Sequence, residues 1–166
     1  MKLLILTLVT LSAYGQAADK ANAHYRTAEG RAGMLANLGS PDRPNRIHAE
    51  RIAEILKVKA GQTVADIGTG AGAMLSVLAP AVGTSGRVYA EDIFPDFLDA
   101  AKKRHADARN IEFVLGSEKD VKLPAGCCDA AVTVDAYHHY DYPAEMLQSI
   151  RKALKPGGKF AVVDYY

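Results

Sequence analysis

A glycine-rich turn with an acid ahead of it is the part of this sequence best suited to hold a ligand. Asp66 precedes Gly68, Gly70 and Gly72, and each glycine leaves the backbone open to close approach. Val64, Ala65 and Ile67 are small or β-branched, so residues 63–67 read as a buried strand. The helix expected after the turn would point its free N–H groups toward the turn. This arrangement predicts a site for a polar ligand at the carboxyl edge of a parallel sheet.

The carboxylate of Asp66 separates two kinds of ligand. Gly68, Gly70 and Ala73 also fit the G-x-G-x-x-G/A pattern of nicotinamide-binding turns. A pyrophosphate in that turn would meet Asp66 as a like charge, whereas an ammonium or sulfonium would be attracted by it. The sequence therefore favours a cationic ligand, with a nicotinamide-dependent oxidoreductase as an alternative.

Two further acids end the next apolar strand, expected over residues 87–92. In a βαβ unit an acid about 20 residues beyond the glycine turn reaches a ribose diol, and one carboxylate can accept from both hydroxyls. We assign this role to Asp92, with Glu91, on the opposite pleat, as the second choice. The alternative is a pair of solvated acids at the start of a helix.

A histidine-rich segment follows the strand expected over residues 129–134. Asp135 is its first polar residue, and His138 and His139 are candidate general bases because a neutral imidazole is available near pH 7. The alternative is that one histidine packs under a lid while the other faces solvent. No metal site is predicted, because adjacent side chains diverge and no further cluster of ligands is present.

The glycine-rich turn and a second motif near the C-terminus resemble motifs of a known family. Residues 64–72 resemble motif I, D/E-x-G-x-G-x-G, of the class I S-adenosylmethionine (SAM)-dependent methyltransferases, and residues 154–160 resemble the family's L-K-P-G-G turn. The resemblance implies SAM as the cofactor and methyl transfer to a small-molecule or otherwise unidentified acceptor. It assigns the methionine end of SAM to the acid and the turn, that is to Asp66, Gly68, Thr69, Gly70 and Gly72.

The resemblance also implies contacts around the rest of the cofactor. Ile93 follows the ribose acid and would lie against the adenine. Many members carry an aspartate near the adenine amine where this chain has Ser117, so Ser117 and Glu118 are the expected contacts. Asp135 is expected to hold the methionine end or to orient the acceptor. A non-catalytic binding module with the same fold remains an alternative.

Strand and helix patterns alternate along the rest of the chain. Repeated βα units with short connections predict an α/β fold with a doubly wound, mostly parallel sheet, Rossmann-like as in class I methyltransferases. Asn45 is expected to cap a helix with an apolar stripe. The chain is expected to stop after the fifth strand, without the family's usual C-terminal hairpin. Strands are expected over residues 63–67, 87–92, 111–115, 129–134 and 159–164, and helices over 72–81, 95–105 and 143–154, with the stripe at Ile47, Ile52, Ile55 and Leu56.

The N-terminus predicts export. Lys2, an apolar run and small residues ending at Ala17 form a signal-peptide pattern over residues 1–17, with cleavage after Gly15 or Ala17. The protein would then be periplasmic or secreted, with no stable membrane span after cleavage; it would be cytoplasmic if this segment is a buried strand or helix. Residues 18–44 are expected to form a leader or lid, and residues 45–166 the SAM-binding domain. The exported start also resembles a group of predicted exported methyltransferases.

The composition of the chain limits the kinds of partner that we expect. A net charge of +1 over 166 residues gives no reason to expect an obligate nucleic-acid partner, and it leaves the oligomeric state open. Cys127 and Cys128 are adjacent, so a bridge between them would be strained, and they have no further partners for a metal site. We interpret them as small residues that precede a strand.

Overall fold

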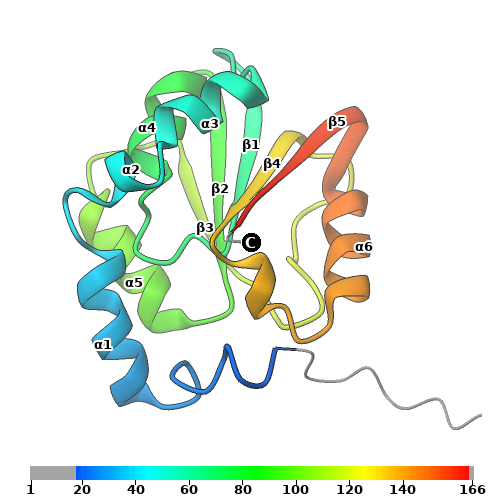
Figure 1. Cartoon of the computed structure of the whole chain (residues 1–166). Helices are drawn as coiled ribbons and strands as arrows, with labels where there is room; N and C mark the ends of the chain where they lie inside the picture. Colours follow the sequence, from blue (N-terminus) through cyan, green and yellow to red (C-terminus); the bar gives the residue numbers. More distant parts are fainter. Residues whose placement is uncertain (1–17, 165–166) are drawn as a thin grey trace, which may run out of the picture.

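Five parallel strands form the sheet at the centre of the molecule (Figure 1). The computed structural model describes residues 18–164, so the signal segment expected over 1–17 lies outside the described residues. The sheet order β3-β2-β1-β4-β5 and its four parallel pairings confirm the predicted Rossmann-like fold class. The order changes direction beside β1, where ligands bind in such sheets. The strands are β1 (Thr63–Ile67), β2 (Arg87–Asp92), β3 (Ile111–Leu115), β4 (Cys128–Val134) and β5 (Leu154–Val163).

Helices cover both faces of this sheet. One face carries α3 (Ala49–Leu56), α4 (Leu75–Val82) and α5 (Pro95–Arg104), and the other carries α6 (Pro143–Ala153). Two helices come earlier in the chain, α1 (Ala28–Leu38) and α2 (Arg43–Arg46), and a short 3-10 helix, η1 (Tyr137–His139), follows β4. Within residues 18–164 every helix falls short of the length and hydrophobicity that crossing a bilayer requires.

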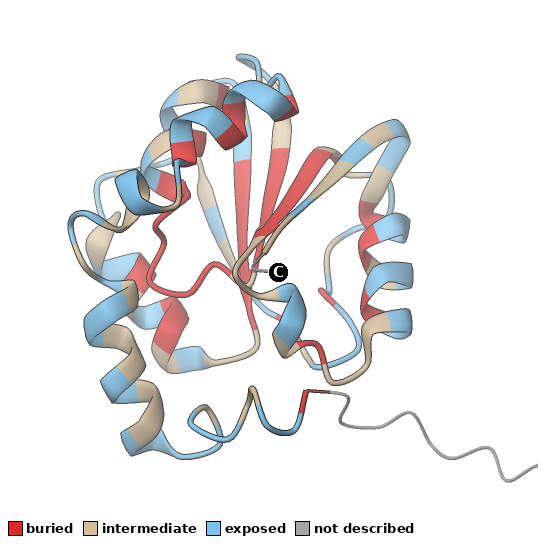
Figure 2. Cartoon of the chain, in the orientation of Figure 1, coloured by how far each residue is buried: buried red, intermediate tan, exposed pale blue. Residues whose placement is uncertain are grey.

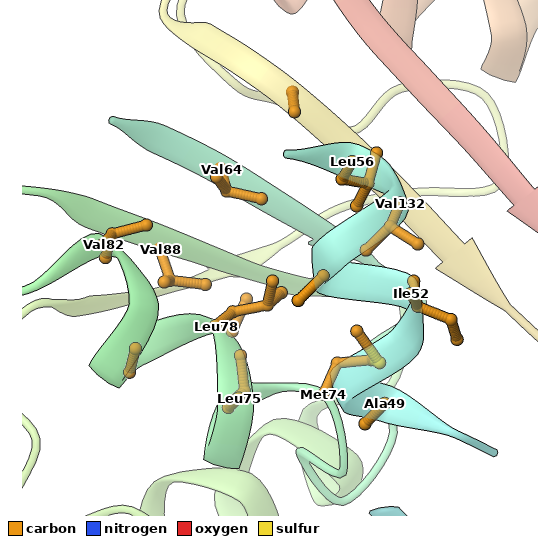
Figure 3. Close-up of a cluster of buried hydrophobic side chains, with 14 of the residues drawn as sticks. Ala49, Ile52, Leu56, Val64, Met74, Leu75, Leu78, Val82, Val88 and Val132 are labelled. Atoms are coloured by element: carbon orange, nitrogen blue, oxygen red, sulfur yellow. The ribbon is translucent and has the colours of Figure 1, made fainter. Parts of the chain in front are cut away.

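The central strands β1, β2 and β4 are largely buried because helices cover both of their faces, whereas the edge strands β3 and β5 are partly exposed (Figure 2). Val64 packs with α3 and α4 in the cluster shown in Figure 3, whereas Ala65 and Ile67 pack with α6. Side chains alternate along a strand, so Asp66 faces the α3–α4 side. On β2 the same alternation places Asp92 on the face of Asp66 and Glu91 on the opposite face.

Several local expectations were wrong in detail. The helix expected over 72–81 begins only at Leu75, because the glycine turn continues through the preceding residues. Asn45 lies inside α2 instead of capping a longer helix. Ile55 of the expected apolar stripe is 61% exposed. The turn expected at residues 155–158 lies within β5, at the point where its register with β4 shifts.

The contrast between two isoleucines of α3 gives a test of the core. Ile52→Ala removes a side chain that is 6% exposed, and we expect the free energy of unfolding to fall by about 2–5 kcal/mol. Ile55→Ala on the same helix should change it by less than about 0.5 kcal/mol, because that side chain is in solvent. Urea denaturation followed by circular dichroism measures both. Equal effects would contradict the packing of α3 on the sheet.

Candidate functional site

A cavity of about 430 Å³ lies at the carboxyl ends of β1, β2 and β4. Side chains from the N-terminal residues 22–47 line it together with the strand ends. Of the residues singled out from the sequence, Gly72, Ser117 and His138 lie outside the lining. The cavity brings together the other nine, namely Asp66, Gly68, Thr69, Gly70, Asp92, Ile93, Glu118, Asp135 and His139.

The glycine turn follows β1 with three left-handed residues, at φ values of +71° for Gly68, +56° for Gly70 and +79° for Gly72. A Cβ on Gly68 would lie 2.8 Å from the Cβ of Ala136, so no side chain fits there. Gly72 has a packing role instead, because its carbonyl oxygen is 2.9 Å from Nε2 of His105 and the same ring occupies the space of a Cβ.

The two predicted acids hold this turn in place from the same cavity. Asp66 Oδ2 accepts a hydrogen bond from the Thr69 hydroxyl at 2.6 Å. Asp92 Oδ2 accepts from the N–H of Gly70 at 2.9 Å, and its Oδ1 accepts from the N–H of Phe94 at 3.0 Å. Asp92 thus joins the glycine turn to the start of α5, and both acids face the same ligand space.

Glu91 is a third buried acid, one that the sequence placed second to Asp92. Its side chain is 1% exposed and lines the cavity from the opposite pleat. Oε2 lies 3.4 Å from the N–H of Gly68, and Oε1 has no hydrogen-bond partner in the described part of the chain. A Cβ on Gly116 would collide with Oε1, so this carboxyl fits only because position 116 is glycine.

These three acids lie together without a cation. The ion pairs of residues 18–164 include none of them. Burial raises the pKa of Asp66 to about 7, that of Asp92 to about 6 and that of Glu91 well above its ordinary value, and the neighbouring acids add to the effect. The cavity floor therefore favours either bound protons or a positively charged ligand.

An arginine that sequence reasoning missed reaches the same cavity. Arg43 of α2 forms a 2.7 Å ion pair with Asp135, which follows β4 in a left-handed conformation with φ +51°. Both side chains are largely buried and line the cavity. The two residues are 92 positions apart, so no local pattern signals this pair.

Aromatic side chains close the cavity on the side of the N-terminal segment. Tyr25 stacks on Phe94, with ring centroids 6.0 Å apart, and meets the edges of Phe97 at 5.9 Å and His139 at 4.6 Å. Arg31 lies over Phe94 at 5.1 Å and pairs with an acid of α5. The segment expected to form a lid thus packs directly on the residues that follow β2 and β4.

The two neighbouring histidines point to different partners. His138 Nδ1 lies 2.6 Å from Asp164, away from the cavity lining. His139 lines the cavity, and its Nδ1 lies 2.8 Å from the side-chain oxygen of Asn22. Burial and the adjacent His138 lower the pKa of His139 to about 4, so its imidazole is neutral at pH 7.

Fold and cavity together define a doubly wound α/β protein with an acid-lined ligand site at the switch point of its sheet. The family model described as "Methyltransferase domain" matches residues 65–162, and the chain belongs to this family.

The chain is also similar to curated proteins and to solved structures. An uncharacterized 37.1 kDa protein in transposon TN4556 of Streptomyces fradiae is 31% identical over 70% of this chain and 34% of its own length. The ubiquinone/menaquinone biosynthesis C-methyltransferase UbiE of Pseudomonas putida is 30% identical over 68% of this chain and 45% of its own length. The chain thus spans a third to a half of these two relatives.

Among solved structures, a SAM-dependent methyltransferase from Aquifex aeolicus superposes with a TM-score of 0.75 and 27% identity, over 80% of this chain and 72% of that one. A putative SAM-dependent methyltransferase from Methanococcus maripaludis gives a TM-score of 0.67 and 27% identity, over 81% and 62%.

The raised pKa of Asp66 predicts how stability depends on pH. The folded chain binds a proton at Asp66 up to about pH 7, whereas the unfolded chain releases it near pH 4, so ionisation between these values destabilises the fold. Asp66→Asn should therefore gain stability relative to the wild type as the pH rises from 5 to 8.

The difference between the two proteins is the measured quantity, because the lowered pKa of His139 adds an opposite slope below about pH 6.5 in both. Urea unfolding across this range gives that difference, with Asp99→Asn, at an exposed site on α5, as the control. A difference that stays constant would show that Asp66 is ionised throughout.

Proposed function

We propose that the chain binds SAM in this cavity and transfers its methyl group to a small-molecule acceptor. The observation that carries the proposal is the set of three buried acids, Asp66, Glu91 and Asp92, with no cation beside them in residues 18–164. SAM brings an ammonium and a sulfonium, which supply the missing positive charge. A pyrophosphate would add negative charge at the same place, and this disfavours the nicotinamide alternative.

The residues present fit such a ligand at both ends. Gly68 and Gly70 give the methionine end a bare backbone, and the adjacent Arg43–Asp135 pair offers one charge of each sign to a zwitterionic amino acid. Asp92 lines the cavity and is our proposed partner of the ribose hydroxyls, and Ile93 beside it would offer an apolar surface to the adenine. Glu118 lines the same cavity and remains available to the adenine amine.

Methyl transfer requires the protein mainly to align the methyl donor and the acceptor. Bound SAM supplies a methyl group that its sulfonium already activates. The chain's own part is to hold an acceptor in line behind that methyl group and to exclude water, and orientation of this kind is worth about 7–11 kcal/mol of the barrier. Tyr25 and Phe97 provide a water-excluding wall at the N-terminal segment.

A small acceptor suits the size of the site. A cavity of about 430 Å³ lies within the usual range of small-molecule pockets. The aromatic wall favours an acceptor with an apolar body, and His139 favours an acceptor atom that loses a proton as it is methylated.

Equilibrium binding tests the proposal directly. Calorimetry should detect SAM binding to the folded wild-type chain, and Asp92→Asn should weaken it tenfold or more, since hydrogen bonds to a charged group contribute about 1.5–3 kcal/mol. Asp99→Asn is the matched control, because Asp99 is an exposed acid of α5 outside the cavity lining, and this variant should bind SAM as the wild type does. Absence of binding at millimolar SAM to a protein with a native unfolding transition would reject the proposal.

We infer that residues 1–17 are an export signal. The first described residue, Ala18, is 7% exposed and its backbone nitrogen lies 3.3 Å from Asp141 Oδ1, so cleavage after Ala17 would place a new ammonium against a carboxylate.

Expression in a bacterium with a Sec pathway checks this. N-terminal sequencing of periplasmic protein should give Ala18 for cleavage after Ala17, or Gln16 for cleavage after Gly15. Ala17→Tyr should block cleavage after residue 17, because the site requires a small residue. Intact Met1 in the cytoplasmic fraction alone would contradict export.

A further inference from the structure

Asn22 of the N-terminal segment contacts His139 through both ends of its side-chain amide. The Oδ1 atom of Asn22 lies 2.8 Å from Nδ1 of His139, and the Nδ2 atom of Asn22 donates to the backbone oxygen of His139 at 3.0 Å. The two residues are 117 positions apart and both line the cavity. Neither the glycine motifs nor the family match draws attention to Asn22, which precedes the matched region.

This two-point contact determines which ring nitrogen carries the proton. A backbone oxygen can only accept, so the NH₂ end of Asn22 must face the His139 carbonyl. The amide oxygen then faces the ring and can only accept as well, and Nδ1 of His139 must therefore be the donor. In a neutral imidazole a proton on Nδ1 leaves the lone pair on Nε2.

The surroundings keep the ring in this state. Tyr25 meets the edge of His139 with centroids 4.6 Å apart, and the His138 ring lies 4.0 Å away on another side. Burial and the nearby imidazole lower the pKa, so the ring is uncharged at neutral pH. Within residues 18–164 Nε2 of His139 has no hydrogen-bond partner, and it is not among the fully buried polar atoms. Because His139 lines the cavity, Nε2 stays available to a molecule bound there.

We propose that Asn22 is a positioning residue that fixes His139 as the Nδ1–H tautomer and thereby makes Nε2 the proton acceptor for the methyl acceptor. The catalytic part of this inference rests on the proposed methyl transfer. As the acceptor atom bonds the methyl carbon, the carbon–sulfur electron pair returns to sulfur, and the proton that the acceptor loses passes to Nε2 and then to water. The tautomer itself is a property of the chain without any ligand.

Nitrogen NMR of the full chain tests the tautomer. Long-range ¹H–¹⁵N spectra at pH 7 distinguish a protonated from a bare ring nitrogen, and His139→Gln identifies the signals. We expect a protonated Nδ1 and a bare Nε2 in the wild type. Asn22→Leu keeps the side-chain size and removes both contacts, and it should abolish the pure Nδ1–H state while leaving His138 unchanged.

Asn37→Leu is the matched control, because Asn37 lies on the exposed surface of α1 and does not contact the ring. A wild-type His139 that carries its proton on Nε2, or a spectrum that Asn22→Leu leaves unchanged, would overturn the inference.

A second variant separates positioning from simple anchoring of the segment. Asn22→Asp keeps an oxygen beside Nδ1 and adds a negative charge, so the pKa of His139 should rise from about 4 by about 1–3. The other groups that act on the ring, His138, Asp141 and Asp164, are the same in both proteins. An unchanged pKa would show that residue 22 does not face the ring in solution.

SAM calorimetry keeps this inference apart from the proposed function. The decisive SAM measurement is made on the wild type, because Asn22 itself lines the cavity. Once a methyl acceptor is identified, the kcat of Asn22→Leu should be lower than that of the wild type, and the pH profile of kcat should shift. Lack of SAM binding by the wild type would reject the proposed function alone, whereas the wrong tautomer would reject the positioning of His139 alone.

Discussion

The site depends on burying negative charge that the fold itself does not neutralise. Asp66, Glu91 and Asp92 are at most 5% exposed and lie at the carboxyl ends of adjacent strands. Backbone N–H groups of the glycine turn and a threonine hydroxyl satisfy part of their hydrogen-bonding capacity, and raised pKa values reflect the remaining cost of ionisation. Such a cluster destabilises the ligand-free fold near neutral pH, and a cation that binds there would regain that free energy.

The N-terminal segment completes this site with charges and hydrogen bonds that the sheet lacks. Arg43 reaches Asp135 after β4, Asn22 reaches His139, and Arg31 of α1 pairs with an acid of α5. Each contact links this segment to residues that follow the carboxyl end of a strand, so the segment forms one wall of the cavity. The apolar counterpart is Tyr25, which packs against rings from both sides of the cleft.

The sequence predicted what local chemistry determines. The fold class follows from alternating βα patterns, and the glycine turn with Asp66 follows from spacing, because both patterns can be read from residues close in the chain. Contacts between distant residues have no such signal, which is why Arg43 and Asn22 were missed. Two neighbouring histidines look alike in a sequence, and only the path of η1 sends His139 to the cavity. Ile55 fits a helical stripe, yet it lies off the face of α3 that packs on the sheet, and its side chain is exposed.

Glu91 shows how the rest of the fold accommodates the charge. Its Oε1 has no partner in the described chain and occupies the space that a side chain at Gly116 would need. That glycine begins the loop after β3, so the acid fits only because the residue that follows β3 has no Cβ. Burying this carboxyl costs desolvation free energy, and an apolar residue of similar size would stabilise the same position. Ligand binding therefore explains Glu91 better than packing does.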